Sequence, residues 1–304
     1  MITLLFIQAA LATGITYDEV PCPLGGAPAR RFHKVAANRA GGYDSDLVAY
    51  STKGQFRTHA ISTCPDSLYS VYGDHIEREV TEEERPAVEA ALSKVKKTLA
   101  DPDNPAVWER YVIAAHVYEA LGRDDLDIAQ IYLEASWTAR DAAVGVYKGG
   151  INGPVAAKQI LTIGATELAK PLTDANRKTV LYALAHVAHR AGESTQRRSY
   201  LKQFSALSLS PEEAKAVKRF TELADKTEPA LQAMAIQYLR AGLAKPGRSQ
   251  MQISHASYLL ADLIRRTGGQ ASEALNLYKA VTANTATPPD IRRMAEFFVT
   301  ELSE

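Results

Sequence analysis

Two cysteines, Cys22 and Cys64, are the side chains of this sequence best suited to metal binding or redox chemistry, and a proline follows each of them. A zinc knuckle holds its metal with Cys-x-x-Cys pairs, but Gly25 and Ser67 occupy the second cysteine positions and supply no thiolate. If the two half-knuckles come together, we expect a disulfide between the cysteines in an oxidising compartment. Closing the loop between them would stabilise the fold by roughly 4 kcal/mol.

Two alternatives to this disulfide stay open. The thiolates of Cys22 and Cys64 could hold a metal that His33, His59 or Asp66 completes, although two thiolates with scattered histidines make a weak zinc pattern. The cysteines could also remain as buried free thiols. We therefore predict no cofactor and no metal ligand, and we keep Cys22, Cys64 and His59 as the candidates for a zinc site.

His186 and His189 are three positions apart on one face of a predicted helix, a spacing that suits two metal ligands or a base and its orienting partner. No acidic residue follows on that face before the predicted helix ends at Gly192, and Leu184, Val187 and Ala188 surround the pair. We therefore expect a groove or core-edge pair, and we assign no catalytic residue.

The doublet Arg265-Arg266 closes another predicted helix. In a superhelical array, arginines on the concave face can clamp a carboxylate or an acidic peptide. Solvated helix faces near C-termini are the commoner explanation of such doublets. Together with His186 and His189, Arg265 and Arg266 are our candidate ligand-groove residues.

The stretch Gly41-Gly42-Tyr43-Asp44-Ser45-Asp46 predicts a tight loop, because glycines tolerate positive φ and short acids bond nearby backbone amides. Its two carboxylates are too few for the six to eight oxygen ligands of calcium. The loop belongs to the segment 13–80, which also contains both cysteines and two strand-like stretches, 30–35 and 55–61. This segment predicts a small β-containing module of cysteine-knuckle type.

Helical signals begin at Thr81. Thr81 and Glu84 have the spacing of a capping box, and Pro86 shifts the expected helix start by a few residues. Further start signals occur at Asn104-Pro105, Ser210-Pro211 and Thr227-Glu228-Pro229, and a long helix is expected over about 125–146.

Glycines end several of these predicted helices. Gly122, Gly192 and Gly268 each follow an apolar-periodic segment, as a glycine at a left-handed C-terminal cap does. Each spacing between them is close to twice the tetratricopeptide period of about 34 residues. We predict a mainly α protein in which residues 81–304 form an α-helical, tetratricopeptide-like repeat array of about ten or eleven helices.

The charge balance argues against a nucleic-acid partner. The 35 Lys and Arg residues match the 35 Asp and Glu residues, so the basic footprint of a nucleic-acid-binding protein is missing. The sequence contains no nucleotide-binding glycine loop, no serine nucleophile elbow and no zinc-protease motif. With 304 residues, the chain is long enough for about two domains.

Residues 1–12 have the order of an export signal, with an apolar run over 2–7 and then the small-x-small triplet Ala10-Leu11-Ala12. No Lys or Arg precedes the run, and the alternative is a first strand or helix that packs on the core. The run is too short to span a bilayer as a helix. We predict a periplasmic or secreted protein without a transmembrane span in the mature chain, with a cytoplasmic protein as the alternative.

The Cys22-Pro23 opening, the loop 41–46, the Thr63-Cys64-Pro65 element and the segment 258–268 with Glu273-Ala274 together resemble a bacterial domain-of-unknown-function family, number 2225. The resemblance covers most of the chain. It implies a cysteine-knuckle module joined to tetratricopeptide-like helices, and it implies no activity. The sequence departs from the family's paired cysteines at Gly25 and Ser67, which favours an exported branch in which a disulfide replaced the metal.

We therefore expect a non-catalytic bacterial envelope protein whose helical array binds another protein or a peptide. Two alternatives stay open, a metal-binding or metal-stabilised sensor that uses Cys22 and Cys64, and a helical enzyme with a histidine-based site. The binding hypothesis needs an accessible concave face. A deep pocket that holds His186 or His189 beside a carboxylate would favour the enzyme.

Overall fold

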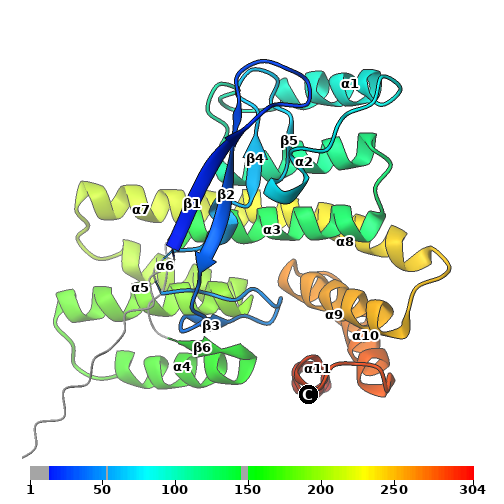
Figure 1. Ribbon diagram of the computed structural model, residues 1–304. Coiled ribbons are helices and arrows are strands. Elements are labelled where there is room, and N and C mark those ends of the chain that lie inside the picture. The colour runs from blue at the N-terminus through cyan, green and yellow to red at the C-terminus, as the bar shows by residue number, and fades with distance from the viewer. Residues whose placement is uncertain (1–13, 53, 145–149) are drawn as a thin grey trace, which may run out of the picture.

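The computed structural model describes residues 14–52, 54–144 and 150–304, and the predicted export segment 1–12 lies outside these ranges. The fold is mainly helical, and most of its short strands lie in the N-terminal part (Figure 1). The strands are β1 (Gly14–Val20), β2 (Ala29–Ala36), β3 (Gly42–Tyr43), β4 (Ile61–Thr63), β5 (Ser70–Tyr72) and β6 (Ile151–Asn152). The helices are α1 (Arg85–Lys96), α2 (Val107–Ala120), α3 (Asp125–Val144), α4 (Gly153–Leu168), α5 (Asp174–Ala191), α6 (Ser194–Ser205), α7 (Pro211–Glu222), α8 (Glu228–Ala244), α9 (Gln250–Arg266), α10 (Ala271–Ala283) and α11 (Pro289–Glu301).

The N-terminal strands form two antiparallel pairs, β1 with β2 and β4 with β5, and β5 packs against α2 (Figure 1). The disulfide between Cys22 and Cys64 joins the β1–β2 connection to the residue that follows β4, with Cα atoms 5.9 Å apart. Both cysteines are buried. The cysteine pairing and the strand expected over 30–35 are therefore present.

The stretch 55–61 is not the strand that its composition predicts. Phe56–Thr58 forms a short 3-10 turn instead. Arg57 of this turn pairs with Asp141 of α3, with 2.6 Å between Nε and Oδ2, and both side chains are largely buried. The long-range ion pair outweighs the strand propensity of the stretch, because β propensity is weak against tertiary contacts.

Local capping signals place several helix ends where the sequence predicts them. Thr81 and Glu84 exchange both hydrogen bonds of a capping box (3.1 and 3.3 Å), and α1 begins at the following residue, next to Pro86. The three stop glycines, Gly122, Gly192 and Gly268, all have positive φ angles. These signals are reliable because each depends only on residues within one turn of the helix end.

Two further helix starts differ in outcome. Ser210 and Glu213 form the capping box that opens α7, as predicted. The start predicted at Asn104 is wrong by two residues, because the N-cap is Ala106. Glu109 accepts a hydrogen bond from the Ala106 backbone N–H (2.7 Å), and this bond fixes the helix start.

Thr227 is not the N-cap that its sequence context predicts, because its backbone is helical. The chain passes from α7 to α8 through a π-helical turn over Leu223–Thr227. Pro229 follows this turn, and a proline cannot donate the usual backbone hydrogen bond to the residue four positions earlier. The wider turn therefore accommodates Pro229 without a break in the helix.

The helices pack in two ways. Sequence neighbours pair, as α4 does with α5, α5 with α6 and α9 with α10. In contrast, α3 packs along α8, although α4 to α7 lie between them in the sequence (Figure 1). In a tandem solenoid each repeat contacts only its neighbours. The mainly helical class is confirmed, and the tetratricopeptide-like array is not.

The interior between the helices is filled by a loop from the N-terminal part, which we call the central loop (residues 41–50). Its strand β3 pairs in parallel with β6. Gly42 has a φ of +78°, and a Cβ atom at this position would lie 1.9 Å from the Ile151 carbonyl oxygen. Only glycine fits this approach, which anchors the loop to the strand before α4.

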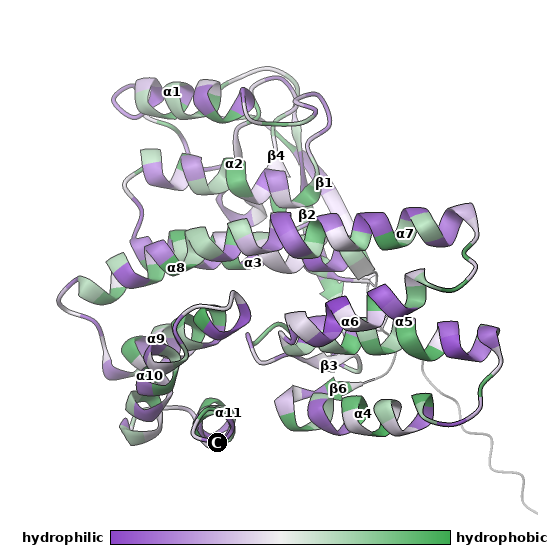
Figure 2. Ribbon diagram, turned by 180° about the vertical axis from the view of Figure 1, so that it is seen from behind, coloured by the Kyte–Doolittle hydropathy of each residue, from purple (hydrophilic) through white to green (hydrophobic). Residues whose placement is uncertain are grey.

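Hydrophobic and hydrophilic residues alternate along the helices, so none of those drawn is apolar all round (Figure 2). Within the described ranges, no helix combines the length and the apolar composition that crossing a bilayer requires.

Candidate functional site

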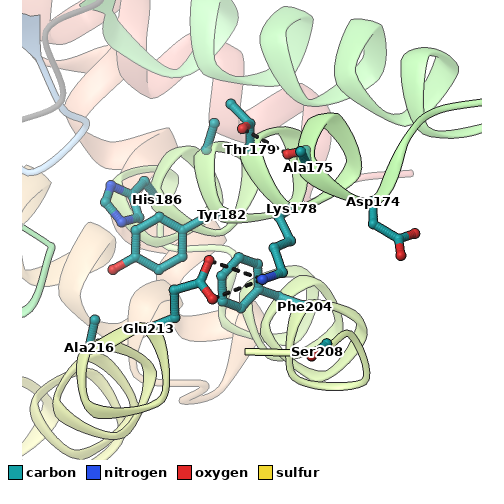
Figure 3. Close-up of a pocket in the computed structure, with 11 residues that line it drawn as sticks. Asp174, Ala175, Lys178, Thr179, Tyr182, His186, Phe204, Ser208, Glu213 and Ala216 are labelled. Carbon is teal, nitrogen blue, oxygen red and sulfur yellow. Dashed lines mark hydrogen bonds and ion pairs between the residues drawn. The ribbon is translucent and has the colours of Figure 1, made fainter. Parts of the chain in front are cut away.

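A cavity of about 700 Å³ opens between α5, α6 and α7 (Figure 3). Its volume is within the range of ligand sites in proteins, and its walls are mostly apolar. We call it the α5–α7 cavity. Its lining residues are Asp174, Ala175, Lys178, Thr179, Tyr182, Ala183, His186, Phe204, Ser208, Glu213 and Ala216.

Aromatic rings build the inner part of this cavity. Tyr182 and His186, one turn apart on α5, have ring centroids 4.4 Å apart. Phe204 from α6 packs against Tyr182 at 5.2 Å, and Phe220 from α7 meets the His186 ring edge-on at 5.3 Å. Each of the three helices therefore contributes a ring to this aromatic cluster, although Phe220 lies outside the cavity lining.

His186 carries an unpaired polar atom at this aromatic base. The residue is 8% exposed, and its Nε2 is buried without a hydrogen-bond partner. Burial lowers the pKa of His186 to about 4, and the nearby His189 adds to this effect. The imidazole is therefore neutral at pH 7, and a neutral ring can offer a donor or an acceptor to a ligand.

An ion pair crosses the cavity from α5 to α7. Lys178 donates to both carboxylate oxygens of Glu213 at 3.2 and 2.8 Å (Figure 3). Glu213 also accepts a hydrogen bond from the backbone N–H of Ser210 (2.7 Å), the N-cap of α7. The bonds from Lys178 and from Ser210 lower the pKa of Glu213. The ion pair therefore ties the two walls of the cavity together.

A second polar feature surrounds Arg140 of α3, which is completely buried. Its guanidinium donates to Asp44 (3.1 Å), to Asp46 (2.6 Å) and to Glu228 of α8 (2.7 Å). Burial alone would raise the pKa of Asp46, but the charges of Arg140 and Arg266 hold that pKa well below its usual range. Burial opposes the ionisation of Glu228 as well, yet Arg140 and His189 lower its pKa to about 2. Both acids are therefore ionised at neutral pH.

The buried charges extend to the C-terminal end of α9. Asp262 accepts hydrogen bonds from Arg266 (2.7 Å) and from Arg265 (2.9 Å), and Ser45 of the central loop donates to it at 3.1 Å. The four carboxylates of Asp44, Asp46, Glu228 and Asp262 face the four guanidinium groups of Arg140, Arg190, Arg265 and Arg266. We call these eight residues the charge cluster. It is balanced, and it holds the central loop between α3, α5, α8 and α9.

The sequence-based expectations at this cluster have different outcomes. The tight loop predicted over 41–46 is present, with a positive φ at Gly42, but Asp44 and Asp46 bind the buried Arg140 and not nearby backbone amides. Arg265 and Arg266 are not on a solvated helix face, since Asp262 binds both of them in the interior. Charged side chains can be buried in this way only when partners of opposite charge meet them from other elements.

His189 lies beside a carboxylate that its own helix does not supply. Its Nε2 is 2.9 Å from Glu228 Oε2, and its Nδ1 is 3.1 Å from the Nη1 of Arg197. Because a guanidinium only donates, Nδ1 accepts, and the proton of the neutral ring is on Nε2, facing Glu228. Burial lowers the pKa of His189 and keeps the ring neutral. Arg197 therefore bonds Nδ1, whereas Nε2 is buried beside Glu228 in a contact that lacks the geometry of a hydrogen bond.

The four predicted ligand-groove residues do not line one groove. His186 lines the α5–α7 cavity, whereas His189 and Arg266 line a polar cleft of about 260 Å³ beside the start of α6. Arg265 lines a third cavity, of about 930 Å³, which lies between α4, α6 and α11. Both arginines are bound to Asp262, so His186 is the predicted groove residue that a ligand can best use.

The candidate zinc residues have other contacts. Cys22 and Cys64 are joined to each other and have no thiolate to offer. The remaining candidates contact a neighbour each: His33 contacts Asp18, His59 contacts Phe32, and Asp66 accepts a bond from the Ala27 backbone. In the part of the chain that the structure describes, no group of three or more His, Cys, Asp or Glu residues is placed to hold a metal ion.

No protein-family model, no curated protein and no solved structure matches the chain. The resemblance to the domain-of-unknown-function family stays a prediction from short motifs. The geometry of the cavities and of the charge cluster is therefore what bears on the function.

Proposed function

We propose that this protein is a non-catalytic binding protein of the bacterial envelope, and that another protein or a peptide inserts an apolar group into the α5–α7 cavity. The observation that carries the proposal is the cavity, with apolar walls from three helices and the neutral imidazole of His186 in its lining. An apolar pocket with a few convergent polar groups is the usual form of a ligand site.

The site lies on the outside of the helical body because the inside is occupied. The central loop fills the space between α3, α5 and α9, where Asp44 bonds Arg190 (2.8 Å) and Ser45 bonds Asp262 (3.1 Å). A peptide could enter there only by breaking buried ion pairs. The accessible concave face that the sequence-based binding hypothesis requires is therefore missing between these helices, and the site that we propose is the outer α5–α7 cavity instead.

The catalytic alternative receives less support from the histidines. His189 is beside the carboxylate of Glu228, but Arg197 donates to its Nδ1 and its Nε2 is buried, so neither nitrogen is open to a substrate. His186 has a free nitrogen, but its nearest ring neighbours are Tyr182 and Phe220 and not a carboxylate. A general base needs both a free nitrogen and a partner that orients it.

The envelope location rests on the disulfide. Disulfides form and persist in oxidising compartments, and the cytoplasm keeps thiols reduced. Cys22 and Cys64 are joined in the structure, which is compatible with a periplasmic or secreted protein.

Photo-crosslinking in the producing cells tests the proposed function. The photoreactive residue p-benzoylphenylalanine replaces Thr179, an exposed residue of the cavity wall. We expect one discrete crosslinked adduct with a partner. Two further variants carry the same photoreactive residue: Ala183→Trp fills the cavity, and Asn176→Trp adds an equal side chain at an exposed α5 position that does not line it.

An adduct that disappears in Ala183→Trp and persists in Asn176→Trp supports the proposal. The same adduct in all three proteins, or no adduct in any of them, contradicts it.

A further inference from the structure

Two of the unpaired polar side chains in the lining of the α5–α7 cavity are aromatic, His186 and Tyr182. Within the described residues, neither the imidazole nitrogens of His186 nor the hydroxyl of Tyr182 has a hydrogen-bond partner, and of these three atoms only Nε2 is completely buried. Both groups belong to rings that are in contact, one turn apart on α5. A ligand that only fills the apolar volume would leave these groups unpaired.

Ring faces are available beside these polar groups. Tyr182 and Phe204 line the cavity together, with centroids 5.2 Å apart and planes inclined by 36°. Aromatic pairs at such distances gain energy beyond simple burial, provided that they are offset or tilted. An aromatic ligand can therefore add a third ring to this pair, which an aliphatic ligand cannot do.

The charges on the cavity wall argue against an anionic ligand. Lys178 is the one cationic side chain in the lining of the described cavity, and Glu213 binds its ammonium group at 2.8 Å. Asp174 at the wall is exposed and negative. His186 is neutral at pH 7 because burial lowers its pKa to about 4. A carboxylate at the base would therefore lose its hydration without meeting an unpaired positive charge.

We propose that the inserted group is a neutral aromatic ring with a hydroxyl or N–H at its far edge, as in tyrosine and tryptophan side chains. The ring packs against Tyr182 and Phe204, and the polar edge bonds His186. This inference rests on the proposed function, because it names the chemical group that the partner supplies.

Calorimetric titration of the full chain at pH 7 with three probes tests the inference. The probes are p-cresol, toluene and p-toluate, which share one ring and differ in the group opposite the methyl. We expect p-cresol to bind about five- to tenfold more tightly than toluene, as one added hydrogen bond allows. We expect p-toluate to bind more weakly than p-cresol.

Variants assign this preference to the base of the cavity. His186→Phe should bring the p-cresol to toluene affinity ratio close to one, and Tyr182→Phe, a milder change at a partly exposed residue, should lower it. Asn176→Trp, outside the cavity, should keep the ratio of the unaltered protein. Circular dichroism checks that each variant is folded.

Other results of the titrations would overturn the inference, the proposed function, or both. Toluene and p-cresol binding equally would overturn the aromatic-polar inference and leave an apolar cavity site standing. Tighter binding of p-toluate, or an unchanged ratio in both folded His186→Phe and Tyr182→Phe, would also overturn the inference. Binding of none of the three probes would overturn both proposals.

Discussion

Replacing Arg140 by methionine tests whether the charge cluster holds the molecule together. Methionine has a similar length and fills much of the same volume, but it removes the cation that Asp44, Asp46 and Glu228 share. These three carboxylates are almost completely buried, so water cannot replace the lost guanidinium. The variant therefore leaves several buried charges without their principal partner.

The expected magnitude follows from the cost of an uncompensated buried charge. Removing one partner of a buried ion pair costs about 3–5 kcal/mol, and Arg140 has three partners. Proteins of ordinary stability have about 5–15 kcal/mol in total. Arg140→Met should therefore lose a large part of the free energy of unfolding. Arg240→Met is the matched control, since Arg240 is 53% exposed and pairs with Glu273 on the surface, and it should cost less than about 1 kcal/mol.

Urea unfolding at pH 7, followed by far-ultraviolet circular dichroism without reductant, measures both variants against the unaltered protein. The slope of free energy against urea should stay similar for a fold of unchanged compactness. If Arg140→Met loses no more stability than Arg240→Met, the cluster does not hold the fold together and the reasoning fails.

Three further predictions concern the disulfide, a buried histidine and a glycine. The double variant Cys22→Ser/Cys64→Ser should lose roughly 4 kcal/mol of the free energy of unfolding, and equal urea midpoints for variant and unaltered protein would contradict this. Burial lowers the pKa of His186 from 6.5 to about 4 in the folded protein. The stability that its neutral form contributes is therefore complete above pH 6.5 and falls by about 3 kcal/mol as the pH drops to 4. His186→Phe should flatten the plot of stability against pH in this window, and an unchanged slope there would refute the prediction. Gly42→Ala should lower the free energy of unfolding by at least about 2 kcal/mol more than Gly25→Ala does, because Gly25 has a similar positive φ but open space around its Cβ position. Equal thermal midpoints for the two variants would argue against the close approach of Gly42 to β6.

Short-range signals in the sequence predict much of the helical fold. The capping box of Thr81 and Glu84 and the stop at Gly192 depend on neighbours within one turn, so the sequence contains all the information they need. The pairing of Cys22 with Cys64 was predictable for another reason. Both cysteines occur in similar Cys-Pro contexts, and an oxidising compartment favours a disulfide between them over free thiols.

Long-range partners explain why the charge cluster could not be predicted. Asp46 and Arg140 are 94 positions apart, and Arg140 and Glu228 are 88 apart. In the sequence each is an ordinary charged residue of a kind that usually lies on the surface. Only the tertiary arrangement of α3, α8 and the central loop brings them together. Their burial also explains why the acids of the central loop bind Arg140 and not nearby backbone amides.

The candidate site was predictable in part. The periodicity of α5 places His186 at a groove or core edge, and it lines the α5–α7 cavity. The opposite wall, with Phe204 and Glu213, comes from α6 and α7, and no local pattern links these residues to α5. The predicted groove therefore contained one residue of the cavity and three that face elsewhere.

The most direct test of a ligand site in the α5–α7 cavity is the carbon–proton NMR signal of the His186 ring during a titration with toluene. A site at this position predicts a saturable shift of that signal in the full chain and in Asn176→Trp. The shift should be absent in Ala183→Trp, in which the indole fills the space. A His186 signal that does not move at any toluene concentration, in a folded protein, would contradict the central claim that this cavity accepts an apolar group.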